Sequence, residues 1–484
     1  MNTESESNKT IAAIATPRGT GGIAVIRISG ASAFEVGEKI FKHKNKNKNK
    51  KFKTFADIPK NTAVFGDIFD CVNGVVIDEG IAVKFKAPNS YTGENTVEIS
   101  CHGGIYIANA VLSSVINAGA KLAEPGEFTK TAYLNGKISL TGAEAVGRLI
   151  SAVNETGAKL ASKQSKGALS KKIRFISDNI KEIVSEVYVY IDYPGEDLTD
   201  MTPDIMLEKL NIIKTELENL KETYNIGRII SEGLNCAIIG KPNAGKSTLL
   251  NMLSRDDIAI VHETPGTTRD IVYSKINTGK FVLNLYDTAG IRTSDNEIEN
   301  IGIEKALAKI EVCALIIGVF DINNFNKDDN MILEILNAAK NGGKKIIPVL
   351  NKCDDIRRER FLSRPDDDVD FSAEPLFISA KNNTVLDSNI SAFEAFNKYL
   401  ENIYEFDGYD LDSGEILTEE RQYYEICAAC ENLNSAIFAL ENGFTQDMSG
   451  MDLELAVKNL DRCDSKSVSE DIVNRIFQNF CIGK

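Results

Sequence analysis

Residues 240–247 constrain the fold of this chain more than any other segment. They read G-K-P-N-A-G-K-S and fit the pattern G-x-x-x-x-G-K-[ST], in which a glycine-rich turn joins a buried strand to a helix. The apolar run 236–239 is the expected strand, and residues 248–253 are the expected helix. Because backbone N–H groups turn inward in such a loop and the helix N-terminus adds positive potential, the segment predicts a phosphate-binding loop.

Three further motifs follow in order. D-T-A-G ends one alternating stretch, and N-K-C-D and S-A-K each follow an apolar run; they occupy residues 287–290, 351–354 and 379–381. Asp354 is suited to accept two hydrogen bonds from the N1 and N2 edge of guanine, a donor pair that adenine lacks. A site built on paired hydrogen bonds discriminates by on the order of 10⁴. The order and spacing of the four motifs are those of a Ras-like GTPase domain.

The motifs also supply candidates for phosphate and magnesium binding. Lys246 is expected to reach the β- and γ-phosphates, and the Ser247 hydroxyl is expected to ligate Mg²⁺. Thr268, in the G-T-T-R-D stretch between the motifs, is the expected switch threonine for the same ion. Asp287 can hold Mg²⁺ through water, and the Gly290 N–H can sense the γ-phosphate.

The totals indicate a multidomain chain. With 484 residues it is too long for one core, and it has no run of about 18 apolar residues. The polar, acidic N-terminus is unlike a signal peptide, and nine cysteines lie scattered without a framework, so we expect a cytoplasmic location and no membrane partner. The C-x-x-C at 427–430 has no partner pair and does not predict a metal or redox site.

The net charge of −15 does not predict a nucleic-acid binder, but the charge is uneven. A lysine- and asparagine-rich insert occupies residues 42–53. It has two interpretations, an arm that attracts RNA and a solvated loop grown by repeat expansion, and the second is favoured.

We predict a multidomain fold in four segments. Residues 1–122 are mixed α/β, while 123–224 and 405–484 are helical and form one discontinuous α-helical domain. Residues 225–404 alternate strand and helix, which predicts an inserted Ras-like α/β P-loop GTPase domain. Within the helical parts, 417–440 is one long candidate helix, and a packed helix is predicted by the stripe Met206, Leu210, Ile213, Leu217 and Leu220.

The chain resembles the MnmE (TrmE) family of tRNA modification GTPases. The C-terminus F-C-I-G-K at 480–484 carries this resemblance together with the GTPase motifs and three N-terminal stretches, 10–30, 88–104 and 125–137. The likeness spans nearly the whole chain outside the insert.

The resemblance implies an N-terminal domain that binds folate and forms a homodimer. It also implies a partner, MnmG (GidA), which carries FAD and uses NADH, and a heterotetramer of the two proteins. Together they would place an aminomethyl or carboxymethylaminomethyl group on C5 of the wobble uridine of certain tRNAs. A 5-formyl- or methylene-tetrahydrofolate would supply the one-carbon unit.

The family's folate contacts fall on Arg27, Glu98, Lys137 and the terminal Lys484. A carboxylate suits the donors of a pterin edge, and Arg and Lys suit the glutamate tail. Arg27 also has a plainer interpretation, a strand arginine neutralised by a neighbouring carboxylate. Cys481 can be read as a thiolate nucleophile or as a small buried residue near the pterin.

The resemblance also implies how hydrolysis proceeds. The residue after the switch glycine is Ile291, which cannot orient water. In the family a potassium ion stands in for an arginine finger, and its ligands fall on Asn243, His262, Thr264 and Thr267. The catalytic glutamate, which orients the attacking water, falls on Glu299, while Arg269 is expected to steady the switch. Glu299 and Lys246 are therefore the predicted catalytic residues.

With these residues the predicted GTP site is complete. It comprises Asn243, Ala244, Gly245, Lys246, Ser247, Thr248, His262, Glu263, Thr264, Pro265, Gly266, Thr267, Thr268, Asp287, Thr288, Ala289, Gly290, Asn351, Lys352, Asp354, Ser379, Ala380 and Lys381.

The chain departs from the family pattern in two regions. Pro265 stiffens the predicted potassium loop. Near the expected join of the folate and helical domains, unusual residues stand at Thr131, Ser139, Gly142 and Arg148. They indicate drift or an altered partner surface.

Three other functions compete with this hypothesis. A ribosome-assembly GTPase of the Era and Der type needs an RNA module with a GXXG loop in a basic C-terminal domain, which the sequence lacks. A folate transferase with a vestigial GTPase conflicts with the intact Lys246, Ser247, Thr268 and Asp354. A purely structural dimer leaves the guanine motifs unexplained.

Overall fold

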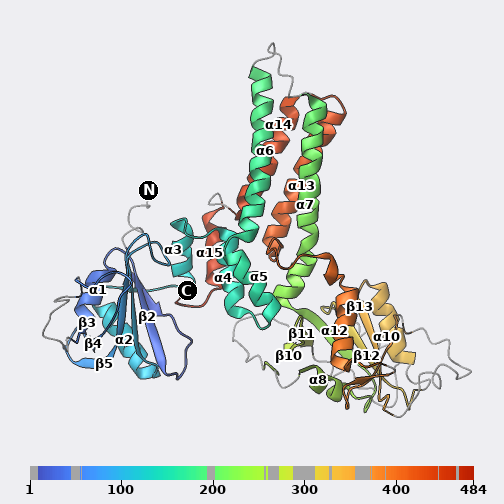
Figure 1. Cartoon of the computed structure of the whole chain (residues 1–484), viewed down its shortest axis with the longest axis horizontal. Coiled ribbons are helices and arrows are strands. Elements are labelled where there is room, and N and C mark those ends of the chain that lie inside the picture. The colour runs from blue at the N-terminus through green and yellow to red at the C-terminus, as the bar shows by residue number, and fades with distance from the viewer. Residues whose placement is uncertain are drawn as a thin grey trace, which may run out of the picture. The chain divides into compact units, whose positions relative to one another are not determined.

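The structure is a computed structural model of the 484-residue chain (Figure 1). It describes residues 9–44, 55, 57–192, 202–254, 258–259, 272–286, 311–325, 330–354, 371, 373–386, 388–444, 446–464 and 468–483. By contacts the chain forms two compact units. The first unit is Met1–Gly147, Gln164–Leu210 and Glu431–Lys484, and the second unit is Arg148–Lys163 and Asn211–Cys430. These divisions cut through single helices, so the four predicted domain limits stay predictions.

The first unit contains a seven-stranded sheet in the order β3-β4-β5-β6-β2-β1-β7 (Figure 1). All described pairings are antiparallel except β1 with β7. The strands are β1 (Ile11–Ile14), β2 (Ile23–Ser29), β3 (Phe41–His43), β4 (Ala63–Phe69), β5 (Val76–Phe85), β6 (Thr96–His102) and β7 (Lys121–Leu122). The helices α1 (Ala33–Ile40) and α2 (Ile105–Asn117) share a buried apolar core with this sheet.

The helices of the first unit continue from the sheet. They include α3 (Glu127–Leu134), α6 (Ala168–Asp192), α14 (Gln446–Asp464) and α15 (Glu470–Gln478). Rings of Tyr133 on α3 and Phe477 on α15 lie 6.2 Å apart, and the Lys130 Nζ donates to the Asn474 side chain at 2.7 Å. These contacts join the C-terminal helix to the segment that follows the N-terminal sheet.

Four helices run from one unit into the other: α4 (Leu140–Ser151), α5 (Glu155–Ser165), α7 (Pro203–Glu232) and α13 (Glu420–Glu441). The predicted stripe on α7 is buried at all five positions. The expected helix over 417–440 is confirmed, but it begins at Glu420. The reason is local: the Gln422 side chain accepts hydrogen bonds from the backbone N–H groups of Thr418 and Glu419, which holds that turn outside the helix.

The second unit contains an eight-stranded sheet in the order β15-β14-β13-β12-β8-β11-β10-β9. Its five central strands are parallel, and β9, β10 and β15 pair antiparallel at the edges. The strands are β8 (Leu234–Ile239), β9 (Ile258–Ala259), β10 (Val272–Asn277), β11 (Val282–Tyr286), β12 (Leu315–Asp321), β13 (Lys345–Asn351), β14 (Leu376–Ser379) and β15 (Thr384–Val385).

Helices α8 (Lys246–Ser254), α10 (Asn330–Asn341) and α12 (Ala392–Ile403) cover this sheet through two separate apolar clusters. Strands buried on both faces read as continuous apolar runs, which is why the sequence located β8 and β13. The predicted strands before the phosphate loop and the two base motifs are confirmed. Within the described residues, no helix is long and apolar enough to span a membrane.

Candidate functional site

The phosphate loop lies at the carboxyl end of β8, the central strand where the order of the sheet reverses, which is the usual ligand position in such folds. Gly240 is required there because a Cβ would come within 2.4 Å of the Val319 carbonyl oxygen. Gly245 has φ +98°, and a Cβ on it would come within 2.1 Å of the Asn351 side chain. Only glycine fits both positions.

The Lys246 ammonium group is held inside the loop. Its Nζ donates to the carbonyl oxygens of Gly240 and Lys241, each at 2.7 Å. Partial burial lowers the pKa of Lys246, because the loop offers dipoles but no negative charge. An anionic phosphate would supply that charge, so the loop fits the phosphate chain of a nucleotide.

Asn351 joins three of the predicted motifs. This residue is 2% exposed; its Nδ2 donates to the Ala244 carbonyl at 3.1 Å, and its Oδ1 accepts from the Ala380 N–H at 3.0 Å. The phosphate loop and the S-A-K loop are thereby fixed to the end of β13. Because a buried amide with both ends satisfied is rigid, the two loops are prepositioned for one ligand.

The Asp354 carboxylate is oriented by two neighbours. Its Oδ1 accepts hydrogen bonds from the Ser379 hydroxyl and, at 2.6 Å, from the Asn382 side chain. Donors on one oxygen leave the other for the N–H groups of guanine. Asn382 did not enter the sequence prediction, although its place directly after the S-A-K motif is a usable signal.

Lys352 occupies a left-handed conformation, with φ 67°. Its Nζ donates to Asp321 at the end of β12, at 2.8 Å. Partial burial alone would raise the pKa of Asp321, but the hydrogen bonds from Lys352 and Asn324 hold it below its usual range. Asp321 was also missed by the sequence analysis; an acidic residue closing an apolar strand is the signal that it offered.

Several predicted residues lie outside the described part of the chain. These are His262, Glu263, Thr264, Pro265, Gly266, Thr267, Thr268, Asp287, Thr288, Ala289, Gly290, Glu299 and Lys484. Of the predicted metal ligands, the structure therefore describes Ser247 and Asn243, both exposed at the loop. Asn243 has φ 65°, a left-handed conformation that asparagine tolerates well.

The hairpin of β10 and β11 connects the two segments that carry the predicted switch residues. Its tip is fixed by side-chain amides: Asn154 donates to the Lys280 carbonyl at 2.9 Å, and Asn397 donates to the Thr278 carbonyl at 3.0 Å. The Lys280 Nζ also pairs with Glu401 at 2.8 Å. The helical segment before α5 and the GTPase sheet are thus joined at this turn within the second unit.

The first unit brings together two predicted folate contacts. Arg27 on β2 lies opposite Glu98 on β6, and its Nε donates to Glu98 Oε1 at 2.9 Å. The structure thus contains the ion pair expected if Arg27 is a strand arginine neutralised by a neighbouring carboxylate. Glu98 remains 28% exposed, and within the described residues only its Oε1 is engaged, so the carboxylate can still accept from a ligand edge.

Lys137 lies against the loop between β5 and β6. Its Nζ donates to the Pro88 carbonyl at 2.9 Å, and its side chain packs on Gly93. The same loop carries Tyr91, whose ring centroid is 5.3 Å from the Arg27 guanidinium carbon. Burial raises the pKa of Tyr91, so its hydroxyl stays neutral. One loop therefore touches both Arg27 and Lys137, which fits a single ligand site.

The C-terminal tail docks on the N-terminal sheet within the first unit. Ile482 bridges Pro125, and a Cβ on Gly483 would come within 2.3 Å of the Ile14 carbonyl oxygen. Cys481 is exposed, so its interpretation as a buried residue is wrong. The tail is fixed through its backbone, with the Cys481 carbonyl accepting from Gly126 N–H at 3.5 Å, and this contact does not bury the thiol.

All four unusual residues have local partners. The Ser139 hydroxyl accepts from the Gly142 N–H at 3.1 Å, and the Thr131 hydroxyl donates to the Glu127 carbonyl. Arg148 pairs with Glu419 in the second unit. Ser139 and Gly142 thus form the N-terminal turn of α4, a structural role that differs from partner recognition.

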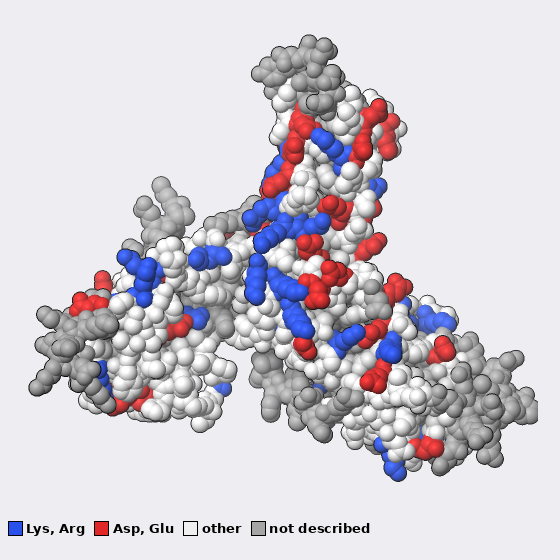
Figure 2. Space-filling model, in the orientation of Figure 1, with Lys and Arg blue, Asp and Glu red and all other residues white. Residues whose placement is uncertain are grey.

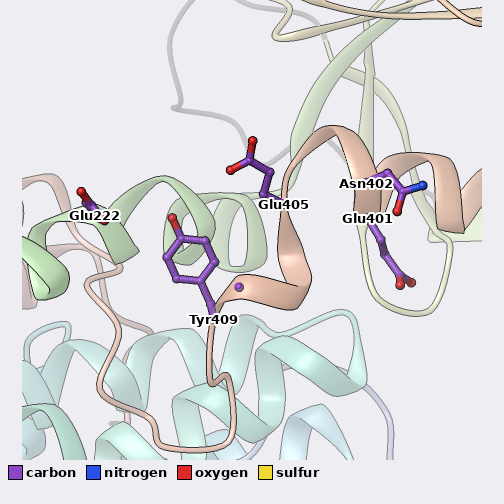
Figure 3. A pocket seen from close by; sticks show the side chains of 6 residues that line it. Glu222, Glu401, Asn402, Glu405 and Tyr409 are labelled. Carbon is purple, nitrogen blue, oxygen red and sulfur yellow. The ribbon is translucent and has the colours of Figure 1, made fainter.

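A cavity of about 460 Å³ lies elsewhere in the second unit (Figure 3). The carboxylates of Glu222, Glu401 and Glu405 line it, with Asn402, Gly408 and Tyr409. Figure 3 shows Glu222 on α7, whereas Glu401 and Glu405 lie on one segment, at the end of α12 and just after it. A wall of like charges disfavours a nucleotide, so this cavity is not the GTP site.

The parallel sheet, its glycine-requiring phosphate loop and the Asn351 bridge define a P-loop GTPase fold. The family model of the N-terminus of the GTP-binding protein TrmE matches residues 10–137. The family model of the MnmE helical domain matches residues 140–481. The chain belongs to the MnmE family of tRNA modification GTPases. It is a GTPase, and the resemblance stated from the sequence is confirmed.

Curated relatives match over nearly the whole chain. The tRNA modification GTPase MnmE of Acetivibrio thermocellus is 37% identical over 482 residues, 98% of this chain and 99% of that protein. Those of Clostridioides difficile and Caldicellulosiruptor saccharolyticus are 37% and 36% identical with the same coverage. Among solved structures, the G domain of the T. maritima FeoB iron transporter is 21% identical with a TM-score of 0.24, covering 35% of this chain and 98% of that one.

Proposed function

We infer that this chain hydrolyses GTP in a potassium-dependent reaction and acts with MnmG (GidA) on tRNA. The pair would install an aminomethyl or carboxymethylaminomethyl group at C5 of the wobble uridine, using a tetrahydrofolate one-carbon donor. The supporting observation is that relatives named tRNA modification GTPase MnmE match 98% of the chain, through both the N-terminal sheet and the nucleotide loops.

The residues of the second unit support the nucleotide steps. Lys246 would exchange its two loop carbonyls for β- and γ-phosphate oxygens when GTP enters. Asp354, oriented by Ser379 and Asn382, would accept the guanine donors. Glu299 would orient the attacking water.

Ser247 and Thr268 would hold Mg²⁺, and Asn243, His262, Thr264 and Thr267 would hold K⁺. These ions, when bound, neutralise charge on the phosphate oxygens. The exposed Ser247 hydroxyl directly after Lys246 fits the first role.

The first unit supports the folate step. Arg27, which pairs with Glu98, and Lys137 both contact the loop between β5 and β6, and the tail that ends in Lys484 docks beside β1. Folate, when bound, supplies the one-carbon unit; the chain's own residues bind and orient it through charge-assisted hydrogen bonds. The exposed Glu98 oxygen fits the donor edge of a pterin.

The remaining features follow from the family. The chain would be cytoplasmic and form a homodimer through its N-terminal domain. It would join MnmG, which holds FAD and NADH, in a heterotetramer.

Analysis of tRNA nucleosides by mass spectrometry tests this function. A strain lacking the gene should lose the C5-modified wobble uridine, and the wild-type gene should restore it. Glu299→Ala should not restore it, whereas the matched control Glu304→Ala should. Normal modified nucleosides in the deletion strain would contradict the tRNA assignment and favour a ribosomal target.

A further inference from the structure

A stretch of concentrated positive charge runs through this acidic chain. Residues 156–177 contain six Lys or Arg and no Asp or Glu, in a protein whose net charge is −15. Its part in the first unit is residues 164–167, with the turn at Lys166, and residues 168–177 at the start of α6. Figure 2 shows Lys and Arg side chains gathered around this end of α6.

The geometry of α6 separates a packed face from a charged one. Leu169, Ile173 and Ile176 are buried, on the side of the helix that packs against α14. Lys171 and Phe175 lie one turn apart on the opposite side, where both are exposed. The charged face is therefore presented to solvent by a helix whose other side is fixed.

The acidic residues of α6 and α14 neutralise only part of this face. The Asp464 carboxylate, 6% exposed, already accepts from the Thr141 and Ser170 hydroxyls, and an Arg174 nitrogen lies 3.7 Å from it. Asp178 and Asp461 pair with Lys181, beyond the basic stretch.

Two lysines keep their charge available. Among the described residues, Lys166 and Lys171 have no acidic partner, although both are exposed. By contrast, Lys159 and Lys163 of the same stretch, in the second unit, pair with Glu155 and Asp412. Unpaired cations on a fixed helix can release counterions from a polyanion.

An exposed aromatic ring lies within the same face. Phe175 is 54% exposed, and the Lys172 Nζ lies 5.9 Å from its centroid. A ring between cations can stack on an unpaired base while the cations contact the phosphates. An acidic protein partner would use the charges but would not need the ring.

We propose that the face formed by Lys166, Lys171, Lys172, Arg174 and Phe175 binds the tRNA substrate through its phosphate backbone and one unstacked base. This inference rests on the proposed function, because it assigns a binding surface to that substrate. It assigns positions that the sequence motifs did not single out.

The experiment measures binding of fluorescein-labelled bulk tRNA to the full-length protein by anisotropy over a salt series. The double variant Lys166→Gln/Lys171→Gln should reduce the slope of log K against log salt by about one to two, one per lost phosphate contact. Phe175→Ala should weaken binding by roughly tenfold with little change in slope. The matched control Lys340→Gln/Lys345→Gln removes two exposed lysines of the second unit and should change neither.

Three results would overturn the proposal: no salt-dependent binding by the wild type, a slope equal to that of the control, or a loss seen with anionic lipid vesicles but not with tRNA. Circular dichroism and GTP hydrolysis by the variants verify folding. Nucleoside analysis distinguishes failure of the proposed tRNA-binding surface from failure of the proposed function. If the double variant binds tRNA normally and restores wobble modification, the surface is wrong and the function stands; if the deletion strain keeps normal nucleosides, the function itself is wrong.

Discussion

The two sheets of this protein hold their candidate sites in opposite ways. In the second unit, the candidate nucleotide-binding groups lie in loops at the carboxyl ends of parallel strands, and a buried amide, Asn351, ties the loops together. In the first unit, Arg27 and Glu98 project from the faces of neighbouring antiparallel strands and pair with each other.

The difference explains which site a sequence can reveal. A loop that wraps phosphate needs glycine at fixed spacings, because a Cβ at Gly240 or Gly245 collides with backbone or side chain. A cross-strand ion pair needs only two residues that are distant in sequence. Such a pair has the same form whether it binds a ligand or only stabilises the sheet.

The strongest test of the loop site is its base specificity. Asp354→Asn should shift the preference from GTP to XTP by on the order of 10⁴, because xanthine carries a carbonyl where guanine carries its 2-amino group. Competition binding with the two nucleotides measures this shift. Folate binding by the first unit should stay unchanged, and a parallel loss of folate affinity would contradict the separation of the two sites.

Removal of the Lys246 ammonium group should have the next largest effect, on GTP hydrolysis. Lys246→Ala should reduce kcat/KM for GTP by about 10² to 10³, the usual cost of losing one donor to the transition state. Phosphate release measured over a range of GTP concentrations gives kcat/KM and checks it, and Lys241→Ala in the same loop serves as control. Equal rates for the two variants would show that Lys246 does not reach the phosphates.

The Asn351 bridge should contribute to folding stability as well as to nucleotide binding. Asn351→Ala leaves the Ala244 carbonyl and the Ala380 N–H without partners and should lower the free energy of unfolding by about 2–3 kcal/mol. Urea titration measures it, with the exposed Asn341→Ala as control. A loss no larger than the control's would mean that the loops do not depend on this residue.

In the first unit, Glu98→Gln should weaken binding of 5-formyl-tetrahydrofolate by roughly tenfold to a hundredfold, since a hydrogen bond to a charged group contributes about 1.5–3 kcal/mol. Calorimetry checks this, with the exposed Glu124→Gln as control. Unchanged folate affinity would leave Arg27 and Glu98 as a structural pair only.

The smallest effect concerns pH. The pKa of Asp321 lies below its ordinary value of 3.8 in the folded state, so its pair with Lys352 stabilises the fold above that pH. This contribution, about 1 kcal/mol for a partly exposed pair, should fade as pH falls through the folded pKa. Asp321→Asn should therefore be less stable than wild type at neutral pH and equal to it in acid, and a constant difference would exclude the linkage.

The parallel sheet and the nucleotide loops could be predicted because their residues carry strong local constraints. Buried strands are continuously apolar, and the phosphate loop needs its glycines. The hydrogen bonds made by Asp321, Asn382 and Asn351 could not be predicted so well. Side-chain hydrogen bonds between distant loops leave no periodic pattern in the sequence. The exposure of Cys481 depends on how the tail's backbone docks, which its residue types do not show.

Both candidate sites are proposed to serve one reaction on tRNA. The most direct measurement quantifies the C5-modified wobble uridine in a strain that lacks the gene and expresses either Lys246→Ala or Glu98→Gln. We predict that wild type restores the nucleoside and that each variant fails, although both proteins are folded. Full restoration by either variant would contradict the claim that the nucleotide loops and the strand pair act in the same pathway.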